Sequence, residues 1–409
     1  MIGLLLEPPE RVASVPPALV YLGFFGLGLN LYWVYLPALV IGVPWLLVCR
    51  GKSSALDSEI VYPVVAFLLY LFSLFSLGWS NFLWDSTLKS VLVVTFCLTI
   101  PVITILFLKP VEIRNAFLFY FSGVVCFILS GVLYTSLVMG LESGRGNIWL
   151  PWKSIYVNSP EFANLTALVA AAAVITGVAS QSRIILSVSV LFFAGSLGIT
   201  AFLDARSFYV IMILTFFFLM LCYQWSKILI VYFLSISLYL VASHFSDAIV
   251  SLLNDSGLMS AFQPGDIGST NVGVQGGDQQ LRGSFFLRFY LWAEGLQALV
   301  INPVGGYRPS GISVWFHNLW LDTASTSGLI PLAFLLILNS GTLIQIILLL
   351  KGAKTLSPAL VIIQIIVLAT MFQDVVIEGN FRLMEIYMLA MVANFYFYSI
   401  NARSFFSDK

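Results

Sequence analysis

Residues 207–245 read SFYVIMILTFFFLMLCYQWSKILIVYFLSISLYLVASHF, and this stretch decides the class of fold. It contains two apolar runs, 207–226 and 228–245, separated by the charged side chain of Lys227. Each run is near the roughly 20 residues that a helix needs to cross the hydrocarbon core of a bilayer. The stretch therefore predicts two membrane-spanning helices joined by a very short turn.

The same pattern recurs along the chain, at 15–30, 31–49, 60–79, 88–108, 115–140, 161–180, 184–203, 207–226, 228–245, 328–350, 357–376 and 383–401. We therefore expect an all-α polytopic membrane protein with about twelve transmembrane helices. Residues 1–409 would form a single integral membrane domain. Within 17–49 only the pair Leu29-Asn30 indicates a break, so two helices, or one long tilted helix with a re-entrant piece, both fit this region.

Composition supports the same class. Apolar residues make up 60% of the chain and charged residues 9%, and the mean hydropathy is +0.98. A soluble domain cannot bury so much apolar surface. The formal net charge is zero, so no field of the whole protein attracts nucleic acid. The proline-rich, charged stretch 1–16 lacks the apolar core of a cleavable signal peptide, and we expect none there.

The basic residues predict the orientation. With a cytoplasmic N-terminus, 11 of the 19 Lys and Arg residues face the cytoplasm and 8 face the opposite side. The cytoplasmic ones lie in nearly every short connecting loop, as the positive-inside rule expects. Six of the eight outer ones are arginines, which bind phosphate in a bidentate manner. We therefore expect cytoplasmic termini and an anion-binding site on the outer side.

A large outer loop is expected at 246–327. Its first part is rich in Gly, Asp, Gln, Ser and Asn and predicts a mobile polar loop. Residues 284–300, SFFLRFYLWAEGLQALV, have apolar positions at helical spacing, with Arg288 and Trp292 four residues apart on one face. This segment predicts an amphipathic helix on the membrane surface. A shorter outer segment, 141–160, carries tryptophans and tyrosine that suit either interfacial anchoring or sugar stacking.

His317 is the strongest candidate for chemistry. It lies in the sequence WFHNLWLD at 315–322, and histidine exchanges a proton near neutral pH without tuning of its pKa. At the outer membrane edge it would deprotonate a sugar hydroxyl. An interfacial histidine that bonds a backbone carbonyl is the alternative interpretation. His244, at a predicted helix end, suggests only capping or solvent exposure.

Four outer arginines are candidate anion ligands. Arg206 begins a predicted helix, where its charge adds to the positive end of the helix dipole, although a local pair with Asp204 also fits. Arg288 either binds substrate or snorkels towards water. Arg282 suits a substrate contact or simple solvation, and the role of Arg308 is open. The outer carboxylates are scattered, so no metal or other cofactor is expected and arginines would stabilise charge instead.

These residues together resemble the superfamily of O-antigen ligases and O-antigen polymerases, which are bacterial inner-membrane glycosyltransferases. The ligases carry His-Asn, nine residues and a glycine, and here His317-Asn318 is followed by nine residues and Gly328. Asp204-Ala205-Arg206 is similar to the family's arginine at a helix start, although the family often has Ser before that arginine. The third similarity is the segment from Arg288 to Trp292, followed by Pro303-Val304-Gly305.

The resemblance covers residues 200–340. It implies a GT-C-like, metal-independent inverting transferase that polymerises O-antigen repeat units linked to undecaprenyl pyrophosphate at the periplasmic face. His317, Arg206 and Arg288 would be catalytic, and Arg282, Asn318, Arg308 and Trp292 would bind substrate. A ligase acting on lipid A-core is the alternative, disfavoured because Leu329-Ile330-Pro331 departs from the ligase motif. A chain-length regulator protein would be a partner. A transporter or flippase and an assembly scaffold are more remote alternatives.

Overall fold

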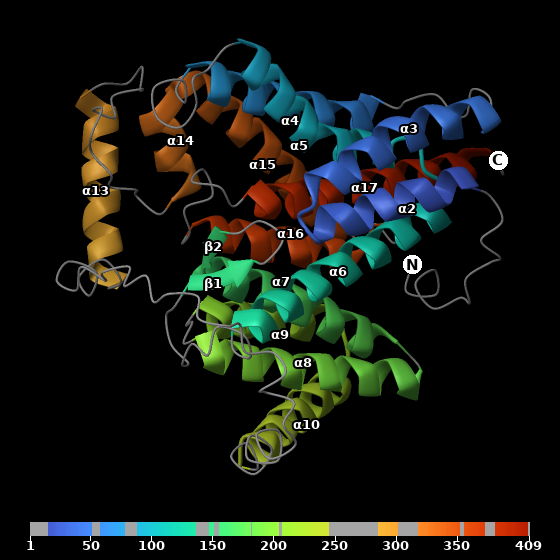
Figure 1. The fold of residues 1–409 in the computed structure, drawn as a ribbon, viewed down its shortest axis with the longest axis vertical. Coiled ribbons are helices and arrows are strands. Elements are labelled where there is room, and N and C mark those ends of the chain that lie inside the picture. Colours follow the sequence, from blue (N-terminus) through green and yellow to red (C-terminus); the bar gives the residue numbers. More distant parts are fainter. Residues whose placement is uncertain are drawn as a thin grey trace, which may run out of the picture. The chain divides into compact units, whose positions relative to one another are not determined.

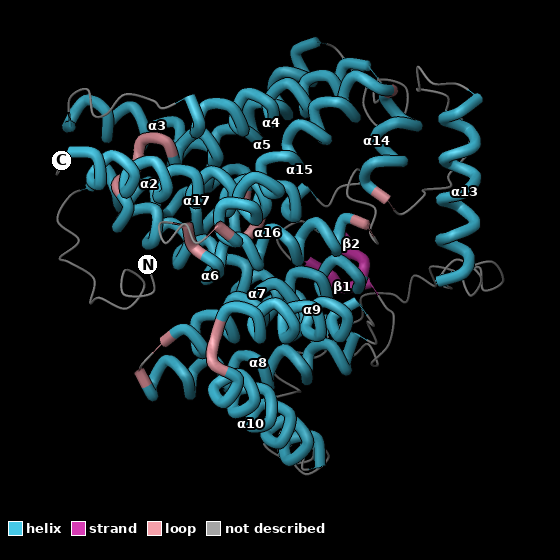
Figure 2. The backbone as a smooth tube through the Cα atoms, turned by 180° about the vertical axis from the view of Figure 1, so that it is seen from behind, coloured by secondary structure: helices cyan, strands magenta, loops and turns pink. Residues whose placement is uncertain are grey.

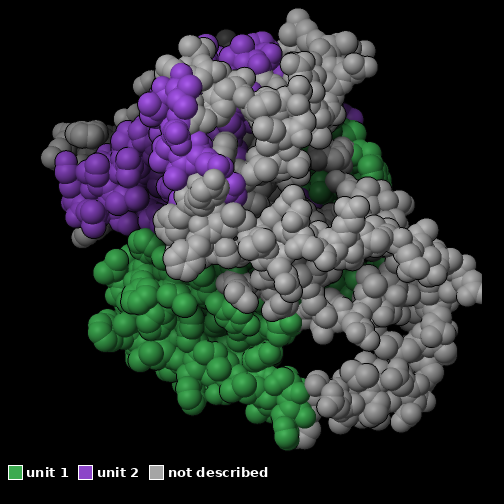
Figure 3. All heavy atoms as spheres, turned by 90° about the vertical axis from the view of Figure 1, so that its left-hand side faces the viewer, with its two compact units in different colours: residues 1–38, 111–269 green, residues 39–110, 270–409 purple. Residues whose placement is uncertain are grey.

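The computed structural model describes residues 15–50, 58–77, 88–135, 147–150, 155–180, 182–203, 207–244, 285–301, 318–351, 356–372 and 381–407 (Figure 1). This part of the chain is helical apart from one short β-hairpin, as the tube in Figure 2 shows. The chain divides into two compact units, coloured separately in Figure 3. Unit 1 comprises residues Met1–Ala38 and Val111–Ser269, and unit 2 comprises Leu39–Pro110 and Thr270–Lys409. Each unit therefore combines two separate stretches of sequence.

The helices of unit 1 are α2 (Val15–Gly28), the start of α3 (Tyr32–Arg50), α6 (Pro110–Leu133), α7 (Ser159–Ala179), α8 (Arg183–Leu203), α9 (Ser207–Cys222) and α10 (Trp225–His244). Helix α7 is central, because it packs against α8, α9 and α10. Its sequence is rich in Ala, and a Cβ on its Gly177 would lie 2.6 Å from the Ser189 side chain of α8. Small residues let membrane helices approach closely, which explains this core position.

Between α6 and α7 lies an antiparallel hairpin of β1 (Asn147–Leu150) and β2 (Ile155–Asn158). Its register places Trp149 opposite Tyr156. The side chain of Ile148 is buried and packs against Gly131 of α6. A Cβ on Gly131 would lie 2.9 Å from the Ile148 side chain. Within the aromatic segment 141–160, the described residues 147–150 and 155–158 are thus paired strands attached to the helical core.

Unit 2 contains the rest of α3 with α4 (Ser58–Leu77), α5 (Leu88–Ile105), α13 (Phe285–Ile301), α14 (Leu319–Ser327), α15 (Leu329–Leu350), α16 (Pro358–Met371) and α17 (Phe381–Ser407). Helix α4 packs against α5, α14, α15 and α17, and α16 packs against α15 and α17. Helix α13 packs against the short helix α14 (Figure 1). The region that the sequence assigns to the outer loop therefore contributes two helices to this unit.

Every apolar run predicted from the sequence contains a helix of the structure. The uncertain region 17–49 forms two helices, with the break at the predicted pair Leu29-Asn30, where Asn30 has a φ of 61°. Five helices are long and apolar enough to cross a membrane, Pro110–Leu133, Phe162–Ala179, Arg183–Ala201, Trp225–His244 and Leu329–Leu350. The protein is therefore a helical protein that associates with a membrane.

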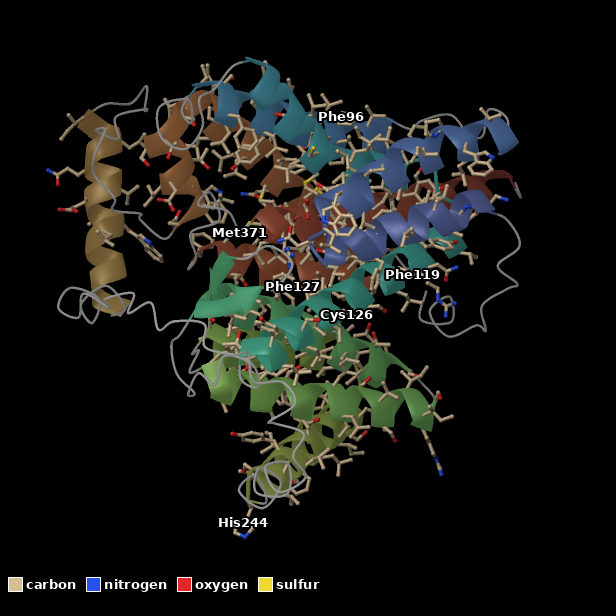
Figure 4. The ribbon with its side chains drawn as sticks, in the orientation of Figure 1. Phe96, Phe119, Cys126, Phe127, His244 and Met371 are labelled. Carbon is tan, nitrogen blue, oxygen red and sulfur yellow. The ribbon has the colours of Figure 1, made fainter. Side chains whose placement is uncertain are left out.

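Exposed side chains on these helices are largely apolar, as expected for a surface in contact with lipid. Figure 4 illustrates the contrast in aromatic residues: Phe127 is fully buried against Phe162, whereas Phe96 and Phe119 are 52% and 44% exposed. A water-soluble protein rarely exposes so many large apolar groups on neighbouring helices. The apolar runs around Cys126 and Cys222 predict small buried side chains, but both thiols are exposed on this apolar surface.

Candidate functional site

The predicted site residues divide into those that the structure describes and those that it does not. Arg206, Arg282, Arg308 and His317 lie outside the described residues. Arg288 lies in α13, but its side chain is not described. Asn318 and Trp292 are fully described. The catalytic roles of these residues therefore remain predictions, and the described elements that adjoin them are α13 and α14.

Asn318 is the N-cap of α14. Its Oδ1 accepts hydrogen bonds from the backbone N–H groups of Trp320 and Leu321, both at 3.2 Å. In return, Oδ2 of Asp322 accepts from the backbone N–H of Asn318 at 3.2 Å. Both side chains are buried, at 5% and 0% exposure. Side-chain oxygens thus satisfy the N–H groups that a helix start normally leaves unpaired.

This cap limits where an anion is held. Free N–H groups at a helix start often bind phosphate, but those of Trp320 and Leu321 are engaged by Asn318. These two N–H groups are therefore not available to a phosphate near this point. The amide oxygen of Asn318 has a structural task, and its predicted contact with substrate remains untested.

Helix α14 is polar and buried, a combination that the sequence interpretation missed. Asp322, Thr323, Ser325, Thr326 and Ser327 are all at most 9% exposed. The sequence predicts a loop over 246–327, whereas the structure has a helix over its last nine residues. The signal that it is a helix was Asn318, since asparagine before an apolar residue is typical of an N-cap.

Hydrogen bonds hold this polar helix in place. The Ser327 hydroxyl donates to the backbone oxygen of Leu74 in α4 at 2.9 Å. The hydroxyls of Thr323 and Tyr70, also in α4, lie 3.3 Å apart. Buried polar groups are costly without such partners, so α4 determines the position of α14.

Gly328 separates α14 from α15. Its φ of 92° and ψ of −167° belong to a region that only glycine adopts readily. Its N–H donates to the Ala324 oxygen at 3.0 Å and closes the last turn of α14. The glycine that follows the His-Asn pair after nine intervening residues therefore has a backbone role.

Helix α13 confirms the helix predicted at 284–300. Leu291 and Gly295 are buried and Trp292 is half-buried, whereas Val300 and Ile301 are 80% and 76% exposed. One side of the helix is therefore packed and its C-terminal end is open and apolar. Because α13 packs against α14, the helix that carries Arg288 lies beside the helix that follows His317-Asn318.

Charged residues are also buried in α17. Arg382 and Glu385 lie one turn apart in its first turns and are 6% and 4% exposed. With Asp322 they are charged groups within the helical core of unit 2. Ionisable groups inside a membrane protein are costly to bury unless they are paired or hydrogen-bonded. His244, by contrast, is exposed at the last residue of α10 (Figure 4).

A second polar cluster, the amide network, lies between α15, α16 and α17. Gln345 is its centre, and its Nε2 donates to the Met391 oxygen at 3.1 Å. Its Oε1 accepts from Nε2 of Gln364 at 2.8 Å and from Nδ2 of Asn394 at 2.9 Å. Oδ1 of Asn394 accepts from the backbone N–H of Ser357 at 2.8 Å.

The backbone groups fix the direction of this network. A carbonyl only accepts and an N–H only donates, so Met391 and Ser357 determine which way Gln345 and Asn394 point. Gln364 must then present Oε1 to Thr342, whose hydroxyl donates to it at 2.9 Å. The hydroxyl of Thr342 also lies 2.7 Å from that of Tyr387. No buried polar atom lacks a partner in the five side chains that the network joins, which are Thr342, Gln345, Gln364, Tyr387 and Asn394.

Among the described residues, no group of three or more His, Cys, Asp or Glu side chains could hold a metal ion. His317, Asp204, Asp374 and Glu378 lie outside that part of the chain, so the prediction of metal-independent chemistry stays untested. No family model matches the chain, and neither a curated protein nor a solved structure is significantly similar to it.

Proposed function

We propose that this protein is an inverting, metal-independent membrane glycosyltransferase that polymerises O-antigen repeat units linked to undecaprenyl pyrophosphate. The proposal includes about twelve membrane crossings, cytoplasmic termini, and a periplasmic loop at 246–327 that bears the active site in a bacterial inner membrane. A polyprenyl-diphosphate-linked glycan is the donor, and a second lipid-linked glycan is the acceptor.

One observation supports this proposal most directly. Helices α13 and α14 pack against each other, although 17 residues separate the end of α13 at Ile301 from the start of α14 at Leu319. This packing brings the backbone of Arg288 and the residues after His317 into one region of unit 2. Transfer from a diphosphate donor needs a cation and a proton acceptor near each other, and we propose that Arg288 and His317 meet this need.

The proposed reaction balances as a single displacement. The acceptor hydroxyl oxygen attacks the anomeric carbon of the donor sugar, and His317 takes the hydroxyl proton. The bond from that carbon to the pyrophosphate oxygen breaks, and undecaprenyl pyrophosphate leaves with the electron pair. Arg206 and Arg288 stabilise the negative charge that grows on it, and loss of one such group would raise the barrier by about 3 kcal/mol.

Matched substitutions in cells test this proposal. The variants His317→Ala and Arg288→Ala should abolish glycan polymer at normal protein levels. His244→Ala and Arg183→Ala are the controls, because both side chains are exposed at helix ends and should leave the polymer unchanged. Unaltered polymer in the His317 and Arg288 variants, with the protein present, would contradict a transferase.

The same experiment separates a polymerase from a ligase. Loss of a polymerase leaves single repeat units on the lipid A-core, whereas loss of a ligase leaves bare core and accumulates lipid-linked polymer. The residues after Gly328, Leu329-Ile330-Pro331, favour the polymerase. Accumulated polymer on undecaprenyl pyrophosphate in the His317 variant would establish the ligase instead.

A lipid-glycan transporter is the second candidate. It is favoured by the break at Gly328 and by buried polar side chains, since transporters use interrupted helices and polar groups within the membrane. However, the side chains of the amide network form hydrogen bonds with one another. None of these five side chains has a buried polar atom without a partner. A passing substrate would have to break these bonds.

Purified protein in liposomes distinguishes the two candidates. With lipid-linked repeat units, a transferase produces polymer. A transporter makes the glycan accessible to a lectin added outside, without polymer. Glycan translocation without polymer would overturn the proposed transfer reaction.

A further inference from the structure

The carboxylate of Asp322 lies in the first turn of α14 and is 0% exposed. Its Oδ2 accepts a hydrogen bond from the backbone N–H of Asn318 at 3.2 Å. The same nitrogen forms the peptide bond to His317, and two bonds of about 1.3 and 1.5 Å lead from it to the Cα of that residue. Covalent geometry therefore keeps this Cα within about 6 Å of the carboxylate, a distance that an imidazole side chain can span.

A neutral oxygen would suffice to cap this backbone group. Asn318 itself caps α14 with an amide oxygen, which accepts from the N–H groups of Trp320 and Leu321. The helix dipole favours an acid in the first turn, but by less than the burial of a charge costs. A fully buried carboxylate is therefore expected to interact with a cation or with several donors. An imidazole is a donor when it is neutral and a cation after it takes a proton.

The helices that pack against α14 carry few other ionisable groups near Asp322. These helices are α4, α13 and α15, and α15 has no ionisable side chain. In α4, Tyr70 is close enough to Asp322 for an electrostatic interaction, but a phenol is neutral near pH 7. In α13, Glu294 is exposed and Arg288 is the cation.

We propose that Asp322 is a positioning residue for His317, whose imidazole donates a hydrogen bond to the Asp322 carboxylate. A carboxylate has about four acceptor sites, so it can serve the Asn318 N–H and the imidazole together. The assignment rests on the proposed function, in which His317 takes the proton of the acceptor hydroxyl on one ring nitrogen. The carboxylate stabilises the resulting imidazolium through the other nitrogen and takes no proton itself.

The pKa of His317 tests this pairing without requiring transfer. Full-length protein with His244→Ala has His317 as its only histidine. The imidazole is labelled with ¹⁵N, and the protein is titrated by NMR in lipid nanodiscs with and without Asp322→Asn. Asparagine keeps an oxygen for the Asn318 N–H but has no charge, so the pKa of His317 should fall by about one pH unit. Arg288 is present in both proteins and does not affect the comparison.

Ser325→Ala is the matched control, because it removes a buried polar group of α14 without changing its charge. The Ser325 hydroxyl donates to the backbone oxygen of Asp322 at 3.1 Å, and its loss should leave the pKa of His317 unchanged. The same pKa with and without Asp322→Asn would overturn the proposal. If Asp322→Asn does not fold, the His244→Ala protein alone provides the test. A ring N–H of His317 that exchanges rapidly with water would then show that no carboxylate holds it.

The pH profile of polymer formation distinguishes positioning from a purely structural role. His317 acts as a base when neutral, so the rate rises as the pH passes its pKa from below. Asp322→Asn should move this acidic limb to lower pH by about one pH unit. It should also lower the maximal rate at least about tenfold, which is part of the roughly 10²–10⁴-fold that a general base contributes. A lower rate with an unmoved limb would make Asp322 a structural residue only.

The outcomes separate this proposal from the transferase. A lower pKa of His317 in Asp322→Asn, with polymer unaffected by His317→Ala, keeps the pairing and rejects the transferase. Loss of polymer in His317→Ala, with a pKa of His317 that does not respond to Asp322→Asn, rejects the pairing and keeps the transferase.

Discussion

Nε2 of Gln364 donates to Oε1 of Gln345 at 2.8 Å and joins α16 to α15 inside unit 2. Both side chains are fully buried. A buried amide is stabilising only while its partners are present, because an unpaired one keeps its desolvation cost. The pair is therefore a sensitive test of whether the amide network holds these helices together.

The two glutamines should not contribute independently. Gln345→Leu leaves Gln364 and Asn394 without their acceptor and should lower the unfolding free energy by about 1–3 kcal/mol. Gln364→Leu should have a similar cost. The double variant removes donor and acceptor together, so its loss should be smaller than the sum of the single losses. Thermal unfolding in detergent measures all three, and strictly additive losses would contradict the network.

Close packing of α2 on α6 should make two glycines irreplaceable. A Cβ on Gly28 would lie 2.1 Å from the Tyr120 oxygen, and one on Gly123 would lie 2.2 Å from the Phe25 oxygen. These are backbone atoms, which cannot move aside as a flexible side chain would. Gly28→Ala and Gly123→Ala should each reduce folded yield and lower the unfolding temperature.

The matched control for these substitutions is Gly195 in α8. A Cβ there has nothing within 4 Å, so Gly195→Ala should be neutral or stabilise by up to about 1 kcal/mol through helix propensity. Thermal scans of the three variants compare them directly. Gly28→Ala that unfolds at the same temperature as Gly195→Ala would contradict the close approach of α2 and α6.

Asn318 offers a test that separates a helix cap from a substrate contact. Asn318→Ala removes the acceptor for two N–H groups and should cost about 1 kcal/mol of stability. Asn318→Ser retains a capping oxygen but loses the amide. If capping is the whole role, the serine variant keeps both stability and glycan polymer. A stable serine variant without polymer would instead support the predicted contact of Asn318 with substrate.

Gly328 should tolerate no side chain. Its φ and ψ, 92° and −167°, lie in a region that excludes residues with a Cβ. Gly328→Ala should lower the unfolding free energy by about 1–3 kcal/mol. Asparagine tolerates the left-handed helical region better than most residues. Gly328→Asn should nevertheless be as unstable as Gly328→Ala, because the ψ of Gly328 lies far from the left-handed helical region. Wild-type unfolding temperatures for both variants would be evidence against this break between α14 and α15.

Sequence alone determined the class of fold and the boundaries of most helices. Apolar runs of membrane length are a local property, because a backbone in lipid must satisfy its own hydrogen bonds and does so as a helix. The break at Leu29-Asn30 was visible for the same reason, since asparagine adopts the positive φ found at Asn30 more readily than most residues. The helix at 284–300 followed from its 3.6-residue period.

Tertiary structure decided what the polar residues do. The sequence predicts a loop where the structure has helix α14. The polar side chains of this helix are stabilised by hydrogen bonds to partners in α4 that lie 253 residues away in sequence, which no local pattern indicates. The sequence gives no sign that three amide side chains within apolar runs, Gln345, Gln364 and Asn394, contact one another. Only the packing of α15, α16 and α17 brings them into one network. The ring contact of Trp320 in α14 with Phe372 at the end of α16 likewise joins residues far apart in sequence. Hydropathy is read along the chain, whereas hydrogen bonds and ring contacts depend on which helices become neighbours.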